Sequence, residues 1–258
     1  MPSLVVYHRG GGKSLGYPPN CIETIRWASH QGAPAIEFDV ALASDERGGE
    51  FLCVVEPKLL ILAHLDINHL RWGDLISINM GNEKVGRVPP VKLKQVLDDI
   101  APSVGLQVHL KSDGKRTAEA AVQELSGREN VLITSFDLRM LHSVKIHNQA
   151  LKVGWLVAPD GIPQSEGVHD LTKKVTSNTT IAPYALGELS AIDEQLRTNQ
   201  VDVAILCGPR IQKREMVSFL KERGYSVGAW GIGTNIALAR QLIDFGIDRF
   251  TIDNPEQM

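Results

Sequence analysis

The sequence of 258 residues contains few cysteines and no strong excess of charge of either sign. Its three cysteines, Cys21, Cys53 and Cys207, lie far apart and form no CxxC pair, which argues against a disulfide framework and against a cysteine zinc site. The formal net charge is -3, so we expect no basic face for nucleic acid or for an anionic membrane. Neither a disulfide-rich protein nor a nucleic-acid-binding protein is indicated.

Long hydrophobic runs and low-complexity tracts are also absent. No apolar run approaches the length of a membrane span. The first apolar run starts almost at Met1 and leads straight into His8, which is not the pattern of a signal peptide. Because this length and ordinary globular composition suffice for one large core, we expect a single domain over residues 1–258 and a cytoplasmic location.

Short strand-like and helix-like segments alternate along the chain. Strands are expected at residues 5–7, 35–40, 51–55, 105–110, 131–134, 153–157, 203–206, 226–230 and 249–252. Helices are expected at residues 21–31, 93–100, 116–125, 138–147, 186–198, 212–223 and 236–245. Asn20 is expected to cap the first helix. The alternation is close to eight strand–helix units in the length that a (β/α)8 TIM barrel needs, and strands rich in Val, Ile and Leu suit a covered parallel sheet.

The alternative fold is a doubly wound open sheet, which usually carries a glycine-rich phosphate turn after its first strand. The segment from Gly10 to Ser14 has that composition, but it lacks the leading glycine of a P-loop and no helical pattern starts at Ser14. The barrel is therefore preferred. Residues 41–92 depart from simple alternation, and residues 158–185 are the least readable part.

Polar residues directly follow or end two of the predicted strands. His8 and Arg9 come after the first apolar run, and Glu37 and Asp39 end the next strand. Charge at the tip of a buried strand is costly unless the group is paired or binds a metal, and active sites of barrels collect at strand ends. Because Glu37 and Asp39 are two residues apart, their carboxylates share one face of the strand.

A third polar set belongs to the strand predicted at 105–110. Gln107, His109 and Lys111 alternate with apolar residues and therefore share one face. A pair of carboxylates with a third donor opposite is what a divalent cation needs, and oxygen-rich sites suit Mg²⁺ or Ca²⁺. The pattern predicts a functional site at the mouth of the barrel.

With these motifs in this order, the sequence resembles the glycerophosphodiester phosphodiesterases. The family's motifs are matched, wholly or in part, at His8-Arg9-Gly10, Pro18-Pro19-Asn20-Cys21, Glu37-Phe38-Asp39, His109-Leu110-Lys111, Ser135-Phe136-Asp137, Trp230 and Asp253-Asn254-Pro255. The likeness runs from about residue 4 to residue 255. It implies a (β/α)8 barrel, hydrolysis of a small-molecule phosphodiester and a place in lipid metabolism.

The resemblance also implies roles for individual residues. The implied site comprises Glu37, Asp39 and His109 as metal ligands, His8, Arg9 and Lys111 as catalytic residues, and Arg9, Lys111 and Trp230 as substrate-binding residues. His8 would act as general base. Arg9 would hold phosphate oxygens in bidentate fashion. Lys111 would add positive charge near the phosphate, and Trp230 would wall the pocket.

The sequence departs from the family at two positions. Val55 stands where the family has its second catalytic histidine, and valine cannot move a proton. His109 stands where the family usually has a glutamate, which weakens the case for Mg²⁺ or Ca²⁺ and favours Mn²⁺, Zn²⁺ or another transition metal; alternatively, His109 binds nothing and the cation site is degraded. His64 is one replacement for the missing acid. Glu56 is another, although strand alternation turns it away from the face that Val55 occupies.

We therefore expect a barrel that hydrolyses a glycerophosphodiester or a related phosphodiester with Mg²⁺, Ca²⁺ or Mn²⁺, or with Zn²⁺ because of His109. The alternative is a catalytically impaired barrel that binds a phosphorylated ligand or a partner protein without turnover. If the scaffold is intact, combining Val55→His, Glu56→Asp and His109→Glu should raise activity. The head group and the oligomeric state stay open.

Overall fold

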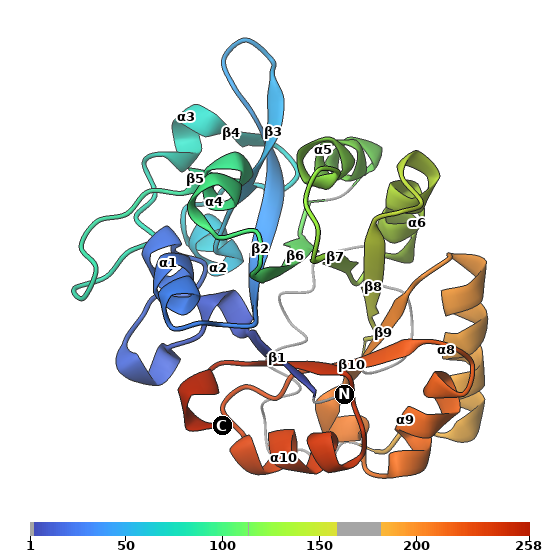
Figure 1. The fold of residues 1–258 in the computed structure, drawn as a ribbon. Helices are drawn as coiled ribbons and strands as arrows, with labels where there is room; N and C mark the ends of the chain where they lie inside the picture. The colour runs from blue at the N-terminus through green and yellow to red at the C-terminus, as the bar shows by residue number, and fades with distance from the viewer. Residues whose placement is uncertain (1–2, 113, 159–181) are drawn as a thin grey trace.

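Eight parallel strands close into a barrel in the computed structural model, which describes residues 3–112, 114–158 and 182–258 (Figure 1). The strands are β1 (Leu4–Tyr7), β2 (Ala35–Ser44), β6 (Gly105–Leu110), β7 (Val131–Ser135), β8 (Lys152–Leu156), β9 (Val203–Cys207), β10 (Ser226–Trp230) and β11 (Arg249–Ile252). Each pairs in parallel with the next, and β11 pairs with β1 to close the ring. The expected (β/α)8 fold is confirmed.

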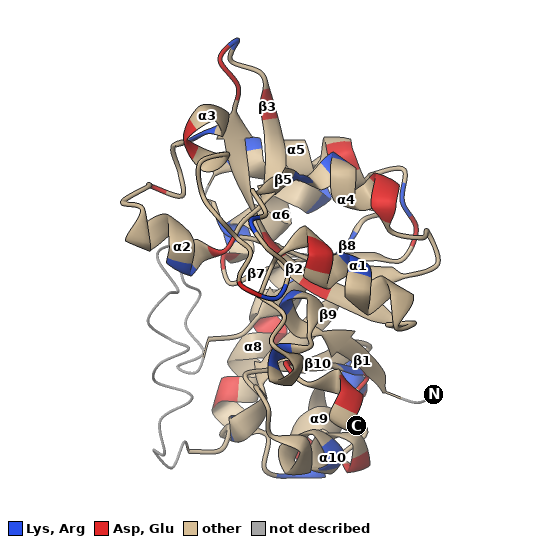
Figure 2. Ribbon diagram, turned by 90° about the vertical axis from the view of Figure 1, so that its left-hand side faces the viewer, with Lys and Arg blue, Asp and Glu red and all other residues tan. Residues whose placement is uncertain are grey.

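Helices surround the barrel (Figure 1). They are α1 (Ile22–His30), α4 (Leu93–Asp99), α5 (Lys115–Leu125), α6 (Leu138–His147), α8 (Leu186–Thr198), α9 (Arg214–Lys221) and α10 (Ile236–Asp244). Each buries an apolar stripe; in α9 it consists of Met216, Val217 and Leu220. Figure 2 shows acidic and basic residues interspersed over the outer elements. The described residues also form four short 3-10 helices: η1 (His8–Gly10), η2 (Lys13–Leu15), η4 (Gly208–Arg210) and η5 (Pro255–Gln257).

One predicted strand is not part of the barrel wall. Residues 51–55 correspond to β3 (Glu50–Val54), which runs antiparallel to the second half of β2. The connection between the two strands is too short for the helical crossover that a parallel neighbour requires. Asp45 closes this hairpin, because its carboxylate accepts the backbone N–H groups of Arg47 and Gly49.

The hairpin opens an insertion between barrel strands β2 and β6. It also contains α2 (Pro57–Leu62), β4 (Leu70–Arg71), α3 (Trp72–Leu75) and β5 (Val91–Lys92). β4 pairs with β2 and β5 pairs with β3. The departure from alternation over residues 41–92 therefore reflects this insertion. The least readable segment, 158–185, lies mostly outside the described residues, so the single domain over 1–258 stays a prediction.

At the N-terminal end of the strands, Asp202 holds two lysines. The Nζ of Lys145, a residue only 6% exposed, lies 2.7 Å from one carboxylate oxygen, and the Nζ of Lys152 lies 3.0 Å from the other. The backbone N–H of Val153 also donates to Asp202, at 2.9 Å. Burial raises the pKa of Asp202, but these three donors outweigh burial and hold the pKa below its ordinary value.

We expect Asp202→Asn to lower the free energy of unfolding by about 2–3 kcal/mol near neutral pH, because Lys145 keeps a buried charge without its partner. Since the folded pKa of Asp202 is lowered, its contribution is complete above the unfolded value of about 3.9 and is lost as the pH falls through the folded value. Urea unfolding of wild type and variant across this range measures the difference. A difference that does not shrink on acidification would contradict the expectation.

Candidate functional site

The site is built where β1, β2 and β6 end. The register between β2 and β6 places Asp39 opposite His109, and Glu37 opposite Gln107. β1 ends at Tyr7, so His8 begins a 3-10 turn at the same end of the barrel. Carboxyl ends of barrel strands are where barrel enzymes hold their catalytic groups.

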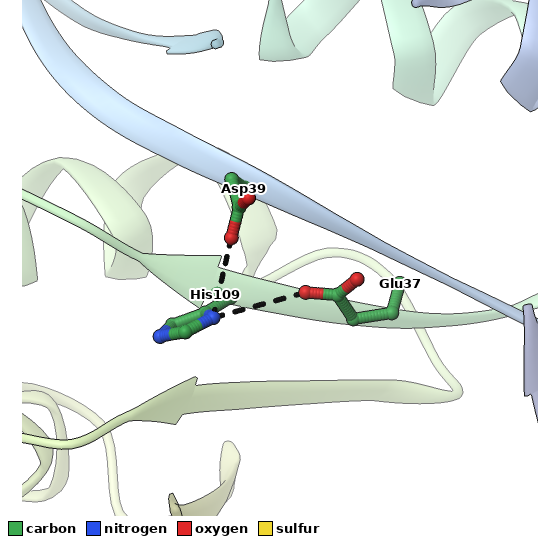
Figure 3. Close-up of side chains that lie close together, drawn as sticks. All are labelled: Glu37, Asp39 and His109. Carbon is green, nitrogen blue, oxygen red and sulfur yellow. Dashed lines mark ion pairs between the residues drawn. The ribbon is translucent and has the colours of Figure 1, made fainter. Parts of the chain in front are cut away.

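Glu37, Asp39 and His109 form a group that could hold a metal ion (Figure 3). All three side chains are buried. Nδ1 of His109 lies 3.2 Å from Oδ1 of Asp39 and 3.8 Å from Oε1 of Glu37. Ligands about 2.0–2.2 Å from one shared ion lie roughly 3–4 Å from each other, so the three donor atoms fit a common cation. Two carboxylates and an imidazole suit Mn²⁺ or Zn²⁺ in particular.

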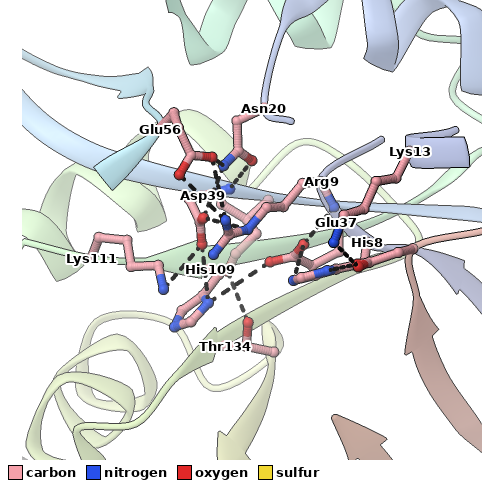
Figure 4. A network of polar contacts seen from close by, with 12 residues as sticks. His8, Arg9, Lys13, Asn20, Glu37, Asp39, Glu56, His109, Lys111 and Thr134 are labelled. Carbon is pink, nitrogen blue, oxygen red and sulfur yellow. Dashed lines mark hydrogen bonds and ion pairs between the residues drawn. The ribbon is translucent and has the colours of Figure 1, made fainter. Parts of the chain in front are cut away.

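Asp39 is the most heavily contacted carboxylate of the site (Figure 4). Arg9 Nε lies 3.2 Å from Oδ2, and Lys111 Nζ lies 3.2 Å from Oδ1. Asn20 also donates its side-chain amide to Oδ2, at 2.9 Å. Burial raises the pKa of Asp39, but Lys111, Arg9 and His109 outweigh burial and hold the pKa well below its usual range. Asp39 is therefore ionised and oriented.

The side chain of His8 is held by Asp253, which directly follows the last strand, β11. Its Nδ1–H donates to Oδ1 of Asp253 at 2.6 Å, and Nε2 lies 3.9 Å from Oε2 of Glu37. Burial alone lowers the pKa of His8, but Asp253 and Glu37 raise it above its ordinary value. Lys13 Nζ lies 3.1 Å from Oδ2 of Asp253, so the glycine-rich segment delivers a cation to this pair instead of forming a P-loop.

The turn after β1 needs its glycine. Gly10 has a φ of 90°, and a Cβ added there would lie 2.7 Å from Cγ2 of Thr24 in α1. Only glycine adopts this conformation without strain. The tight contact with α1 lets the backbone N–H of Arg9 donate to Oε2 of Glu37 at 2.9 Å. The His-Arg-Gly sequence thus positions a metal-ligand candidate as well as His8 and Arg9.

Two residues at the site were assigned elsewhere by the sequence reasoning. Asn20 does not cap the first helix: Cys21 occupies that position, and Asn20 has a φ of 56°. Its side chain instead bridges Asp39 and Glu56, at 2.9 and 3.0 Å, and accepts the backbone N–H of Asp39. Glu56 also accepts from Nη1 of Arg9, at 3.3 Å. The one signal that could have found Asn20 is its match to the family motif.

Val55 and Glu56 do face opposite ways, but Glu56 is the residue on the site. Val55 is fully buried in a second apolar cluster with Ala41, Ala43, Cys53, Leu60, Leu70 and Leu75. Position 55 therefore lies in packed apolar surroundings. His64, the other replacement considered for the missing acid, is exposed and takes part in none of the hydrogen bonds or ion pairs of the described site.

Aromatic side chains line the site next to His109. The Phe136 ring centroid lies 5.6 Å from that of His109, and Trp230 meets Phe136 edge to face at 5.2 Å. Trp230 is 7% exposed and donates its ring N–H to the carbonyl of Val157 at 3.0 Å. It is thus fixed beside the ligand group. Asp137, in contrast, caps α6 by accepting the backbone N–H of Arg139.

Comparisons with known proteins place this geometry in context. No family model matches the sequence, and no curated protein matches it. A phosphodiesterase from Oleispira antarctica, solved with the product sn-glycerol-3-phosphate, is 21% identical with a TM-score of 0.75 over 99% of this chain and 95% of that one. Glycerophosphodiester phosphodiesterases from Parabacteroides distasonis (19% identity, TM-score 0.73, 99% and 94% coverage) and Thermotoga maritima (19%, 0.71, 100% and 97%) are similar.

The chain therefore has the (β/α)8 fold of glycerophosphodiester phosphodiesterases, and the resemblance indicated by its motifs is confirmed at the level of the fold. The similarity spans almost the full length of each protein. At these identities it establishes the architecture, while the roles of single residues are proposals. Within residues 3–112, 114–158 and 182–258, no helix is long and apolar enough to cross a membrane.

We expect Asn20→Gly to weaken binding of Mn²⁺ about 10-fold or more, because Asp39 loses the amide that orients it while glycine keeps the positive φ. Isothermal titration calorimetry measures the affinity, and thermal unfolding measures the loss of stability. Asn130→Gly is the matched control, since Asn130 is exposed and has a φ of 57°. Unchanged affinity in a folded but less stable Asn20→Gly protein would limit Asn20 to a structural role.

Proposed function

We propose that the chain hydrolyses a phosphodiester, of the glycerophosphodiester type or a related one, with a divalent metal held by Glu37, Asp39 and His109. The observation that carries this proposal is the convergence of these three buried donors with two permanent cations and an oriented histidine at one end of the barrel. The fold shared with phosphodiesterases supports it.

His8 is proposed as the proton acceptor. Asp253 holds Nδ1–H, so the other ring nitrogen, Nε2, faces the site near Glu37. In the proposed step the oxygen of water bonds to phosphorus and its proton passes to Nε2, while the bond from phosphorus to the leaving oxygen breaks. The leaving group departs as its oxyanion, which takes a proton from solvent. Asp253 then stabilises the imidazolium. Asp253 is a positioning residue, because it contacts His8 and not the substrate.

Arg9 and Lys111 are proposed to hold the phosphate oxygens. Lys111 has 14% of its side chain exposed and Arg9 has 26%. Nε of Arg9 is ion-paired with Asp39, and Nη1 is ion-paired with Glu56. The remaining nitrogen of Arg9 is then left for the phosphate, and a second nitrogen becomes available if the contact with Glu56 opens. A bound divalent cation would offset charge on the phosphate as a Lewis acid. Trp230 would close one wall.

The leaving alcohol meets an unusual environment. Position 55 is a valine packed into an apolar cluster. It therefore offers no group that could protonate the leaving oxygen. A leaving group of low pKa needs little protonation, so this site is expected to favour activated esters. The same feature favours the second candidate function, a barrel that binds a phosphate ester without turnover.

Purified protein with Mn²⁺, Mg²⁺, Ca²⁺ or Zn²⁺ is expected to release p-nitrophenol from bis-p-nitrophenyl phosphate and, more slowly, choline from glycerophosphocholine. His8→Ala is expected to reduce the rate about 10²–10⁴-fold, whereas His30→Ala, on the exposed end of α1, serves as the matched control. Absence of turnover with every metal, together with measurable binding of the phosphate ester, would support the second function instead.

Val55→His is expected to destabilise the protein by about 2–3 kcal/mol without raising turnover, because the imidazole enters an apolar cluster without a partner. This outcome differs from the gain that the sequence alone predicts for restoring the family residues. Urea unfolding and kinetics on glycerophosphocholine measure both effects, with Val55→Ala to separate lost packing from added polarity. A folded Val55→His protein with higher turnover would show that position 55 reaches the substrate.

A further inference from the structure

Gln107 is a polar residue of the barrel wall to which the proposed function gives no role. It lies on β6 two residues before His109, so alternation places both side chains on the same face of the strand. Its neighbours Leu106 and Val108, on the other face, belong to the apolar core. Gln107 itself is only 2% exposed. A buried primary amide therefore lies on the strand face that carries His109.

The side-chain amide of Gln107 has no partner within the described protein. Among residues 3–112, 114–158 and 182–258, its side chain takes part in no hydrogen bond or ion pair. Burying an amide without a hydrogen bond is costly, and most buried amides are paired. Gln107 is also not among the side-chain atoms of these ranges that are both sealed from solvent and unpartnered. Its amide atoms therefore keep a small contact with solvent and are available to a ligand.

The sheet register places Gln107 at the fourth corner of the candidate ligand group, whose other three corners are drawn in Figure 3. On the neighbouring strands β2 and β6, Asp39 is opposite His109 and Glu37 is opposite Gln107. From its row, Glu37 brings Oε1 to within 3.8 Å of Nδ1 of His109. Glutamine has the same length and shape as glutamate, and Gln107 starts from the same row about 4.8 Å away, one strand over. Its Oε1 can therefore reach the same cation.

We propose that Gln107 supplies a fourth protein ligand to the cation through Oε1, and that this oxygen favours Mn²⁺ over Zn²⁺ at the site. The inference rests on the proposed metal centre and deepens it. An amide oxygen is a hard donor of the kind that Mg²⁺, Ca²⁺ and Mn²⁺ bind. With Glu37, Asp39 and His109 it gives three oxygen donors and one nitrogen. Zinc prefers a larger share of nitrogen and sulfur, whereas Mn²⁺ accepts both the oxygens and the imidazole.

A neutral ligand at position 107 suits a site that has an imidazole at position 109. The amide of Gln107 adds a hard oxygen without adding negative charge, so the cation keeps the positive charge that attracts a phosphate ester. His109 is a softer donor than a carboxylate. Gln107 thus restores the hardness of the ligand set and leaves its charge unchanged.

The test measures binding of Mn²⁺ and of Zn²⁺ to the metal-free protein by isothermal titration calorimetry, so it needs no substrate. Gln107→Leu keeps an apolar side chain of similar volume and removes the amide oxygen. It is expected to weaken Mn²⁺ binding about 10–100-fold and Zn²⁺ binding about 10-fold less than that. Gln107→Glu places a charged oxygen at the same position and is expected to tighten Mn²⁺ binding about 10-fold or more.

Thr134→Val is the matched control, because Thr134 is also fully buried, lies opposite His109 on β7, and has the shape of valine. It is expected to leave both affinities unchanged. The electron paramagnetic resonance spectrum of bound Mn²⁺ gives a second reading, which is expected to change in Gln107→Leu and not in Thr134→Val. Thermal unfolding without metal checks the fold. Gln107→Leu is expected to be at least as stable as wild type, because it removes an unpaired buried amide.

A selective loss of Mn²⁺ affinity in Gln107→Leu, with tighter Mn²⁺ binding in Gln107→Glu, supports the proposal. Unchanged Mn²⁺ affinity in Gln107→Leu overturns it, as does an equal loss for both metals, which would mean that Gln107 only orients Glu37. If Gln107→Leu does not fold, Gln107→Glu decides, because Mn²⁺ binding no tighter than in wild type overturns the proposal.

Failure of the proposed hydrolysis has a separate signature, the absence of turnover in wild-type protein that binds Mn²⁺. In that case the ligand role of Gln107 is still decided by the affinities. Wild-type protein that binds no Mn²⁺ overturns this inference together with the metal centre on which it rests.

Discussion

The buried charge of Asp39 is the constraint on which the site depends. This carboxylate is 1% exposed, and an ionised carboxylate in such a position is costly unless it is paired and hydrogen-bonded. Its partners come from the turn after β1 (Arg9), the segment before α1 (Asn20) and the end of β6 (His109 and Lys111). These segments meet because β1, β2 and β6 lie side by side in the sheet. Satisfying one charge therefore fixes the mouth of the barrel and places the candidate metal ligands.

The architecture was largely predictable because a covered parallel sheet leaves a clear pattern. Barrel strands such as β7 and β9 are apolar or buried at every position, and amphipathic helices separate them. The insertion after β2 was not predictable in the same way. Leu52, Cys53, Val54 and Val55 are all fully buried, so this segment looks like another barrel strand. Its direction is set by the short hairpin connection, which is a property of the turn at Asp45 and not of hydrophobicity.

The candidate site was predictable where alternation decides which way a side chain points. Glu37, Asp39 and His109 lie on strands whose opposite face is apolar, so period-two reasoning brings them together. Glu56 was not assigned to the site, because the residues on either side of it are both buried. The sequence alone does not say which face of this segment points to the mouth of the barrel. Asn20 was not assigned to the site because an asparagine before a helix usually caps that helix. In the structure its positive φ directs the side chain of Asn20 to the carboxylates instead.

The charges at the mouth argue for what the site accepts. The described network contains the carboxylates of Glu37, Asp39, Glu56 and Asp253 and the permanent cations Arg9, Lys13 and Lys111. Without the two histidines in the sum, four negative and three positive charges leave one negative charge, which repels a phosphodiester. A divalent cation reverses that balance to one positive charge, equal and opposite to a phosphodiester monoanion. A doubly charged phosphate monoester, the product of the proposed hydrolysis, is attracted to a singly positive site more strongly than the diester is, because the Coulomb energy grows with the charge of the ligand. The charge balance therefore selects for phosphate esters in general, and release of the product has to depend on other contacts.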